Sequence, residues 1–289
     1  MTLQGRSAII TGASQGLGTA IAEAFVEAGA SLLICARNGN DLQTVCMRLG
    51  QKVTSGQQVH ARVCDVANPD AVNALVTTAL SLFPALDILV NNAGIYGPMG
   101  HIEQVDWNEW VQAINVNLMG TVYPCRALLP HLRDRGTGKI INISGGGATA
   151  PLPGLSSYAV SKAGVVRFTE TLHEEVKGSG IFVNAVAPGL LATRLLDQVI
   201  ESGPDKVGSE FHRRMVKARE EGGTPLTVAA NLCVWLASPA SDGVSGKLIS
   251  AVWDPWEEFQ SHRAELDGSD IYTLRRIVPK DRGKAWGDK

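Results

Sequence analysis

The chain has 289 residues, of which 45% are hydrophobic and 19% are charged, a composition that excludes a disordered chain. Its net charge of −2 excludes a general attraction to nucleic acid or to anionic membranes. No apolar run reaches the roughly 20 residues that span a bilayer. The five cysteines form no C-x-x-C pair and the first residues show no signal-peptide pattern, so we expect reduced thiols and a cytoplasmic location.

Short apolar runs alternate along the chain with longer amphipathic segments. The short runs are rich in Val, Ile and Leu and are mostly unbroken, which is typical of parallel strands buried on both faces. Seven strands are predicted: Ser7–Thr11, Ser31–Ala36, Val59–Cys64, Asp87–Asn91, Lys139–Ser144, Ile181–Val186 and Lys247–Ala251.

The segments between these runs have helical character. Asn68 and Pro69, for example, supply an N-cap and a proline at the first helical position. The predicted helices are Gly16–Ala28, Asp41–Leu49, Pro69–Leu82, Trp107–Arg133, Ser157–Lys177 and Thr227–Ala237. The alternation predicts an α/β fold, a Rossmann-like doubly wound sheet of seven mostly parallel strands with helices on both faces.

These elements all fall within residues 1–252, which we predict to form one domain. Inside it, the polar segment Glu201–Gly223 is broken by Gly203 and Pro204 and is interpreted as a mobile helix–loop insertion. Residues 253–289 do not fit a further strand–helix unit and carry aromatic residues among many charges. They are predicted to be an ordered tail that packs on the same domain or on a partner subunit.

A glycine-rich turn joins the first predicted strand to the first predicted helix. A diphosphate is bound by backbone N–H groups at the positive end of a helix dipole, and glycine lets the backbone approach it closely. The position between strand and helix is the context that dinucleotide binding requires. The predicted binding residues of this turn are Gly12, Ser14, Gln15, Gly16, Leu17 and Gly18.

The second predicted strand ends at Ala36, Arg37 and Asn38, without the acidic residue that usually binds the adenosine ribose of NAD. Arg37 can instead meet a 2′-phosphate, so we expect NADP(H) to be preferred, with NAD(H) as the alternative. Gln15 weakens this preference, because a basic residue there would add a second phosphate contact. Arg37 is otherwise a solvated surface residue.

Tyr158 and Lys162 stand four residues apart at the start of a predicted helix, so they share one helix face. The pKa of a tyrosine is normally about 10. A nearby ammonium or nicotinamide cation favours the phenolate and lowers that pKa. Such a tyrosine can donate a proton to a carbonyl oxygen or accept one from an alcohol.

With these motifs in place, the sequence resembles the short-chain dehydrogenase/reductase family, in its short single-domain branch, over residues 5 to about 252. The family motifs appear in order as Thr11–Gly18, Cys64–Val66, Asn91–Gly94, Asn115–Asn117, Ile141–Ser144, Tyr158–Lys162 and Pro188–Gly189. The resemblance, for example to 3-oxoacyl-acyl-carrier-protein reductases and to alcohol, sugar and steroid dehydrogenases, implies an NAD(P)-dependent oxidoreductase. It would transfer a hydride between nicotinamide and a small carbonyl or secondary alcohol substrate.

The resemblance also implies roles for single residues. Tyr158 corresponds to the acid/base, and Lys162 to the residue that holds the nicotinamide ribose and lowers the pKa of the tyrosine. Asn117 corresponds to the asparagine that supports a water-linked proton relay to the lysine. The remaining cofactor-binding positions are Asp65 and Val66 at the adenine, Asn91, Ala93 and Gly94 beside the ribose and central strand, and Pro188, Gly189 and Thr193 at the nicotinamide carboxamide.

Family members are commonly homodimers or homotetramers that pair through two long helices, which correspond here to 107–133 and 157–177. The same resemblance therefore implies a homodimer or a homotetramer.

One catalytic position departs from the family pattern. The serine that hydrogen-bonds the substrate oxygen falls on Gly145, and Ser144 is one residue early, on the opposite side of a strand. Three hypotheses remain open. Ser144 turns into the site, or another donor such as Thr149, Ser156 or a backbone N–H of the glycine run holds the oxygen. Alternatively, the protein is a nucleotide-binding regulator with weak or no turnover.

The C-terminal end departs as well, because Ser250–Trp256 replaces the usual family turn. Trp253 or Trp256 is interpreted as a pocket wall or as a packing or interface residue. The basic run Arg213–Arg219 is interpreted as a solvated helix face or as a clamp on an anionic substrate. No His/Cys cluster has metal-ligand spacing, so no catalytic metal is expected.

Overall fold

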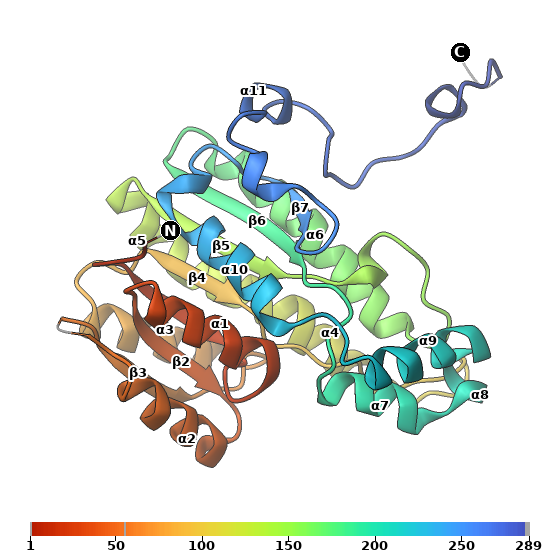
Figure 1. Ribbon diagram of the computed structural model, residues 1–289, viewed down its shortest axis with the longest axis horizontal. Coiled ribbons are helices and arrows are strands. Elements are labelled where there is room, and N and C mark those ends of the chain that lie inside the picture. Colours follow the sequence, from red (N-terminus) through yellow and green to blue (C-terminus); the bar gives the residue numbers. More distant parts are fainter. Residues whose placement is uncertain (1, 55, 287–289) are drawn as a thin grey trace.

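The protein is described by a computed structural model that covers residues 2–54 and 56–286. Within these residues, seven parallel strands form one sheet in the order β3-β2-β1-β4-β5-β6-β7, with helices on both faces (Figure 1). The predicted Rossmann-like doubly wound fold is confirmed. The strands are β1 (Ser7–Thr11), β2 (Ser31–Ala36), β3 (Val59–Val63), β4 (Ile88–Asn91), β5 (Gly138–Ile143), β6 (Ile181–Ala187) and β7 (Leu248–Ser250).

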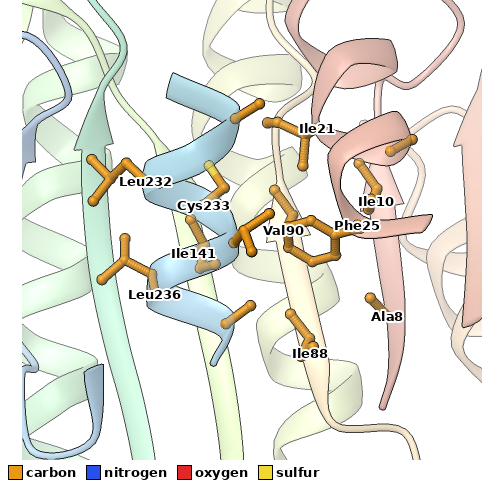
Figure 2. Packing of buried hydrophobic residues seen from close by; sticks show 14 of the residues in the cluster. Ala8, Ile10, Ile21, Phe25, Ile88, Val90, Ile141, Leu232, Cys233 and Leu236 are labelled. Atoms are coloured by element: carbon orange, nitrogen blue, oxygen red, sulfur yellow. The ribbon is translucent and has the colours of Figure 1, made fainter. Parts of the chain in front are cut away.

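Each face of the sheet has its own apolar core. Helices α1 (Gly16–Glu27), α2 (Gly39–Gly50) and α10 (Leu226–Ala237) cover one face. Figure 2 shows the Phe25 ring of α1 beside Val90 of β4, and both residues belong to the same core cluster as Leu236 of α10. The other face is covered by α3 (Pro69–Leu82), α5 (Gly120–Arg135) and α6 (Ser156–Val176). No helix in the described ranges is long and apolar enough to cross a membrane.

The predicted helix Trp107–Arg133 is helical throughout, but it contains a π turn that the sequence did not predict. The structure has α4 (Trp107–Ile114), a π-helical segment (Asn115–Met119) and then α5. Asn117 in this segment is completely buried, and its amide bonds both backbone groups of Ile95, at 2.8 Å each. Single π turns of this kind often mark functional sites, and this one directs a polar side chain away from the helix ladder.

The segment after β6 is more ordered than the predicted insertion. It forms α7 (Arg194–Ser202), α8 (Pro204–Val207) and α9 (Ser209–Glu220), so its helical part starts before the expected Glu201. These helices enclose a separate apolar cluster of Leu155, Leu196, Val199, Val207, Met215 and Ala218. The cluster lies beside the carboxyl edge of the sheet (Figure 1), where it forms a wall next to any ligand bound there.

The C-terminal segment packs over α10 and the edge strand β7. The side chains of Trp256 and Phe259 belong to the core cluster of that face, and their rings contact Trp235 with centroids 5.8 and 6.2 Å apart. The carbonyl of Tyr272 accepts a hydrogen bond from the N–H of Leu248 at 2.8 Å, which covers part of the open sheet edge. The division of the chain at residue 252 stays a prediction.

Two tryptophans in this segment provide a matched test of the packing. Trp256 is 8% exposed and Trp253 is 83% exposed. Trp256→Ala should lower the free energy of unfolding by about 3–5 kcal/mol, since a large core side chain is lost. Trp253→Ala should change it by less than about 0.5 kcal/mol. Urea titrations of both variants measure the difference, and equal effects would contradict the packing described here.

Candidate active site

A cavity of about 550 Å³ opens at the carboxyl edge of the sheet. Its wall is formed by the β1–α1 turn, the ends of β2 to β5, the first turn of α6 and the loop after β6. The strand order reverses between β1 and β4, and ligands of open α/β sheets bind in the crevice at such a point. The fold therefore places the glycine-rich turn and the Tyr158 region on one cavity.

The glycine turn is held against the end of β4 by close backbone contacts. Gly12 has φ +66°, and a Cβ there would come within 2.7 Å of the Ala93 Cα. A Cβ on Gly18 would overlap the carbonyl oxygen of Gly12. Asn92 fastens the contact, because its Nδ2 donates to the carbonyls of Thr11 and Gly12 at 2.9 and 3.1 Å. The backbone at the start of α1 is thereby exposed to the cavity without intervening side chains.

Arg37, Asp65 and Val66 line the far end of the cavity, as predicted. Arg37 is exposed at the end of β2. Asp41, which was not predicted, lines the same region, and its carboxylate accepts a hydrogen bond from the Asn38 amide at 2.6 Å. A cation and an anion therefore border the end of the cavity where an adenosine would lie.

Tyr158 and Lys162 lie one turn apart on α6 and both line the cavity. Lys162 is 4% exposed, and its Nζ donates to the Ile143 carbonyl at 2.8 Å. Burial lowers the pKa of this ammonium to about 8. Burial, reinforced by the neighbouring Tyr96, raises the pKa of Tyr158 far above its usual value. The lowering of this pKa expected from Lys162 and a bound nicotinamide stays a prediction.

Asn117 does not line the cavity, but it bonds the helix that carries Tyr158 and Lys162. Its Nδ2 donates to the Ser161 hydroxyl at 2.9 Å. A Cβ on Gly94 would lie 3.3 Å from the Asn117 Oδ1 and 3.5 Å from the Lys162 Nζ. The structure therefore brings together Asn117, Gly94 and Lys162, which are far apart in the sequence.

The structure shows where the Ser144 hydroxyl points and what surrounds position 145. Ser144 lines the cavity, but it is buried and its hydroxyl donates to the Lys162 carbonyl at 3.2 Å. At position 145, a Cβ would collide with the Tyr158 Oη. The phenol thus occupies the space that a side chain at this position would need.

The other proposed hydroxyl donors lie outside the cavity wall. Ser156 accepts a hydrogen bond from the Trp110 Nε1 at 3.0 Å, and Thr149 is exposed. Neither of them borders the cavity, and Trp253 and Trp256 do not border it either.

One predicted cofactor residue points elsewhere. Asn91 is buried, and its Nδ2 donates to the Asn142 Oδ1 at 2.9 Å and to the Cys125 Sγ at 3.2 Å. It joins β4 to β5, in keeping with a residue beside the central strand, and does not line the cavity, so its contact with a nucleotide stays a prediction. The wall contact belongs to Asn92, because successive residues at the end of a strand face opposite sides.

The other predicted positions at the cavity are in place. These are Gly12, Ser14, Gln15, Gly16, Leu17, Gly18, Ala93, Gly94, Pro188, Gly189 and Thr193. Tyr96, which the sequence interpretation missed, also lines the wall. Its position two residues after the Asn91–Gly94 motif is the sequence feature that could have identified it. In residues 2–54 and 56–286, no cluster of His, Cys, Asp or Glu could hold a metal ion.

Comparison with known proteins places the chain in a family. A family model described as short chain dehydrogenase matches residues 6–203, and the protein belongs to the short-chain dehydrogenase/reductase family. The predicted resemblance is thereby confirmed. The protein is an oxidoreductase whose family uses a nicotinamide cofactor and a small-molecule substrate.

Individual relatives match nearly the whole chain. The short-chain reductase protein NovJ of Streptomyces niveus is 35% identical over 84% of this chain and 90% of its own length. The 3-oxoacyl-acyl-carrier-protein reductase FabG of Chlamydia trachomatis is 33% identical over 86% of this chain and 96% of its own. A crystal structure of an actinorhodin polyketide ketoreductase variant with NADPH is 30% identical, with a TM-score of 0.77, and covers 86% of this chain and 97% of its own.

The buried Lys162 makes protein stability depend on pH. Its folded pKa of about 8 lies below the usual lysine pKa of 10.5, so the unfolded chain binds more protons between these values. Stability should therefore rise with pH in that window. Relative to Lys162→Met, the free energy of unfolding should increase by about 2 kcal/mol from pH 7 to pH 9.5. Denaturant titrations at several pH values measure this difference, and a flat profile would show that the ammonium is solvated.

Proposed function

We propose that the protein transfers a hydride between a nicotinamide nucleotide and a carbonyl or secondary alcohol, with Tyr158 as the acid/base. One observation carries this proposal: Tyr158 and Lys162 open into the same cavity that the glycine turn lines. A phenol and an ammonium are therefore available at one end of a cavity whose other end suits a diphosphate.

The residues present fit a dinucleotide. No side chain in the described ranges caps the N-terminus of α1, where Gln15 is the N-cap residue, so the first helical N–H groups are available to a phosphate. The glycine cradle at Gly12 and Gly18 has no room for Cβ atoms and keeps the backbone accessible. We assign the diphosphate to this turn, the adenosine to Asp65 and Val66, and the nicotinamide end to Pro188, Gly189 and Thr193.

The nicotinamide ring supplies or accepts the hydride when it is bound. Tyr158 moves the proton at its Oη. Burial raises the pKa of this phenol and keeps it protonated at neutral pH, ready to donate to a carbonyl oxygen. Lys162 is anchored on the Ile143 carbonyl and holds the nicotinamide ribose. Asn117, fixed by Ile95 and Ser161, supports a water-linked proton path to Lys162.

A second candidate is a nucleotide-binding regulator with little or no turnover. The absence of a side chain at Gly145 favours it, because the family serine hydroxyl is missing. The buried Lys162 argues against it, since an ammonium is costly to bury and buried ionisable groups with a shifted pKa gather at functional sites.

We propose NADP(H) as the preferred cofactor, with Arg37 as the residue that meets the 2′-phosphate. Arg37 lines the adenosine end and is exposed. The related ketoreductase crystal structure contains NADPH. Asp41 at the same end opposes this preference, so its carboxylate should weaken phosphate binding.

We further propose a cytoplasmic homodimer or homotetramer that pairs through α4, α5 and α6. The exposed apolar side chains Trp107, Val111 and Val160 on α4 and α6 support such an interface.

The acid/base role is tested by Tyr158→Phe, which removes only the hydroxyl. Turnover of the best carbonyl from a panel, followed as NADPH oxidation at 340 nm, should fall by about 100- to 10,000-fold. Nucleotide affinity, measured by fluorescence, should stay within about threefold. A turnover close to that of the native protein would refute the role. Nucleotide binding without any turnover of the native protein would favour the regulator.

Cofactor preference is tested by Arg37→Ala, with Arg48→Ala as the matched control. Arg48 lies on α2, the helix that follows Arg37, and pairs with Glu23 away from the cavity. Arg37→Ala should raise KM for NADPH about tenfold or more and leave KM for NADH unchanged, because a charged hydrogen bond is lost. Arg48→Ala should change neither value. A native enzyme that prefers NADH would overturn the proposal.

A further inference from the structure

The proposed reaction leaves one role without a residue. A carbonyl oxygen that gains negative charge is stabilised by a second hydrogen-bond donor beside the acid. Position 145 has no side chain, and the Tyr158 hydroxyl fills the space where one would begin. The Ser144 hydroxyl is committed to the Lys162 carbonyl. Residues 145–147, whose backbone N–H groups were the other candidate donors, do not line the cavity, which leaves donors on other parts of the wall.

Side-chain hydroxyls on the cavity wall are few in the described part of the chain. They belong to Ser14, Tyr96, Ser144, Tyr158 and Thr193. Ser14 lies in the glycine turn and Thr193 lies in the loop after β6, where it contacts the Gly16 position. Next to Tyr158, this leaves Tyr96.

Tyr96 lies directly against Tyr158. The two rings are 4.6 Å apart between centroids and tilted by 54°. Both rings pack on the apolar cluster formed by α7, α8 and α9. An ionised Tyr96 would raise the pKa of Tyr158, so the two phenols share one electrostatic environment. No hydrogen bond to the Tyr96 hydroxyl is made by any group in residues 2–54 and 56–286.

The backbone on both sides of Tyr96 is fixed. Asn117 bonds the N–H and the carbonyl of Ile95, the residue before it. Ser157 donates to the Tyr96 carbonyl at 3.3 Å. Gly97, with φ +75°, packs so closely that a Cβ there would lie 2.6 Å from the Ala113 Cβ. A donor held in this way needs little reorganisation when charge develops on a ligand oxygen.

We propose that the Tyr96 hydroxyl takes the place of the missing serine and donates a hydrogen bond to the substrate oxygen beside Tyr158. This inference rests on the proposed function and adds a catalytic residue to it. Tyr96 keeps its proton throughout, and Tyr158 transfers its own. Burial also raises the pKa of Tyr96, which keeps it a donor across the neutral range.

The proposal explains why glycine occupies position 145. A side chain there would displace the Tyr158 Oη, and with it the contact between the Tyr158 and Tyr96 rings. Gly145→Ser would consequently lower turnover, although it introduces the serine that the family resemblance implies at this place.

The test compares Tyr96→Phe with Ser144→Ala. Each variant removes one hydroxyl from the wall, and the phenylalanine keeps the ring packed against Tyr158. With the best carbonyl of the panel, Tyr96→Phe should lower kcat by about 100- to 1000-fold, as loss of such a donor does. Ser144→Ala should lower it by less than about threefold. Nucleotide affinity should be unchanged in both variants.

A binding measurement separates this assignment from the proposed function. Trifluoroethanol, an alcohol that is followed by its own fluorine NMR signal, is titrated into the protein with NADP⁺ present. Tyr96→Phe should weaken its binding about tenfold, whereas Ser144→Ala should bind like the native protein. If this pattern holds but no carbonyl is reduced, the proposed function fails and the Tyr96 assignment stands.

Three outcomes would overturn the assignment. The first is native-like kcat and alcohol binding in Tyr96→Phe. The second is a large loss in Ser144→Ala instead. The third is no alcohol binding to the native protein, since a built oxygen site has to hold an alcohol.

Discussion

The close approach of two glycine positions to neighbouring backbone is the constraint on which the site depends. Gly12 lies on the backbone of Ala93, and Gly18 lies on the carbonyl of Gly12. These contacts bring the start of α1 to the end of β4, and Asn92 fixes them by hydrogen bonds. A side chain at either glycine would separate these elements. The chemistry at the other end of the cavity follows from this geometry, because the β4 end also carries Gly94 and Tyr96.

Burial determines the electrostatics of the candidate active site. Lys162 is held inside the protein by one backbone carbonyl, and its pKa is lowered to about 8. The pKa of Tyr158 is raised by the same desolvation. Both pKa shifts favour the uncharged forms, the amine of Lys162 and the phenol of Tyr158. A ligand with positive charge beside the phenol would favour its ionised form, which couples proton transfer to the state of the cofactor.

Local sequence patterns predicted the strands and the cavity residues well, because these features are determined by residues close together in the sequence. The apolar runs located seven strands within one or two residues, and the glycine turn and Tyr158–Lys162 mark the cavity. Contacts between distant segments were not accessible in this way. Asn117 lies in a π turn and bonds Ile95, and Asn91 bonds Asn142 on the next strand. Tyr96 is recognised only once Tyr158 lies against it.

A crystal structure of the protein with NADPH tests the central claim most directly. The account predicts that the diphosphate contacts the backbone from Ser14 to Gly18. It also predicts the nicotinamide ring beside the Tyr158 Oη and the ribose within hydrogen-bond distance of the Lys162 Nζ. A nucleotide bound elsewhere, or one whose nicotinamide lies away from Tyr158 and Lys162, would contradict the account.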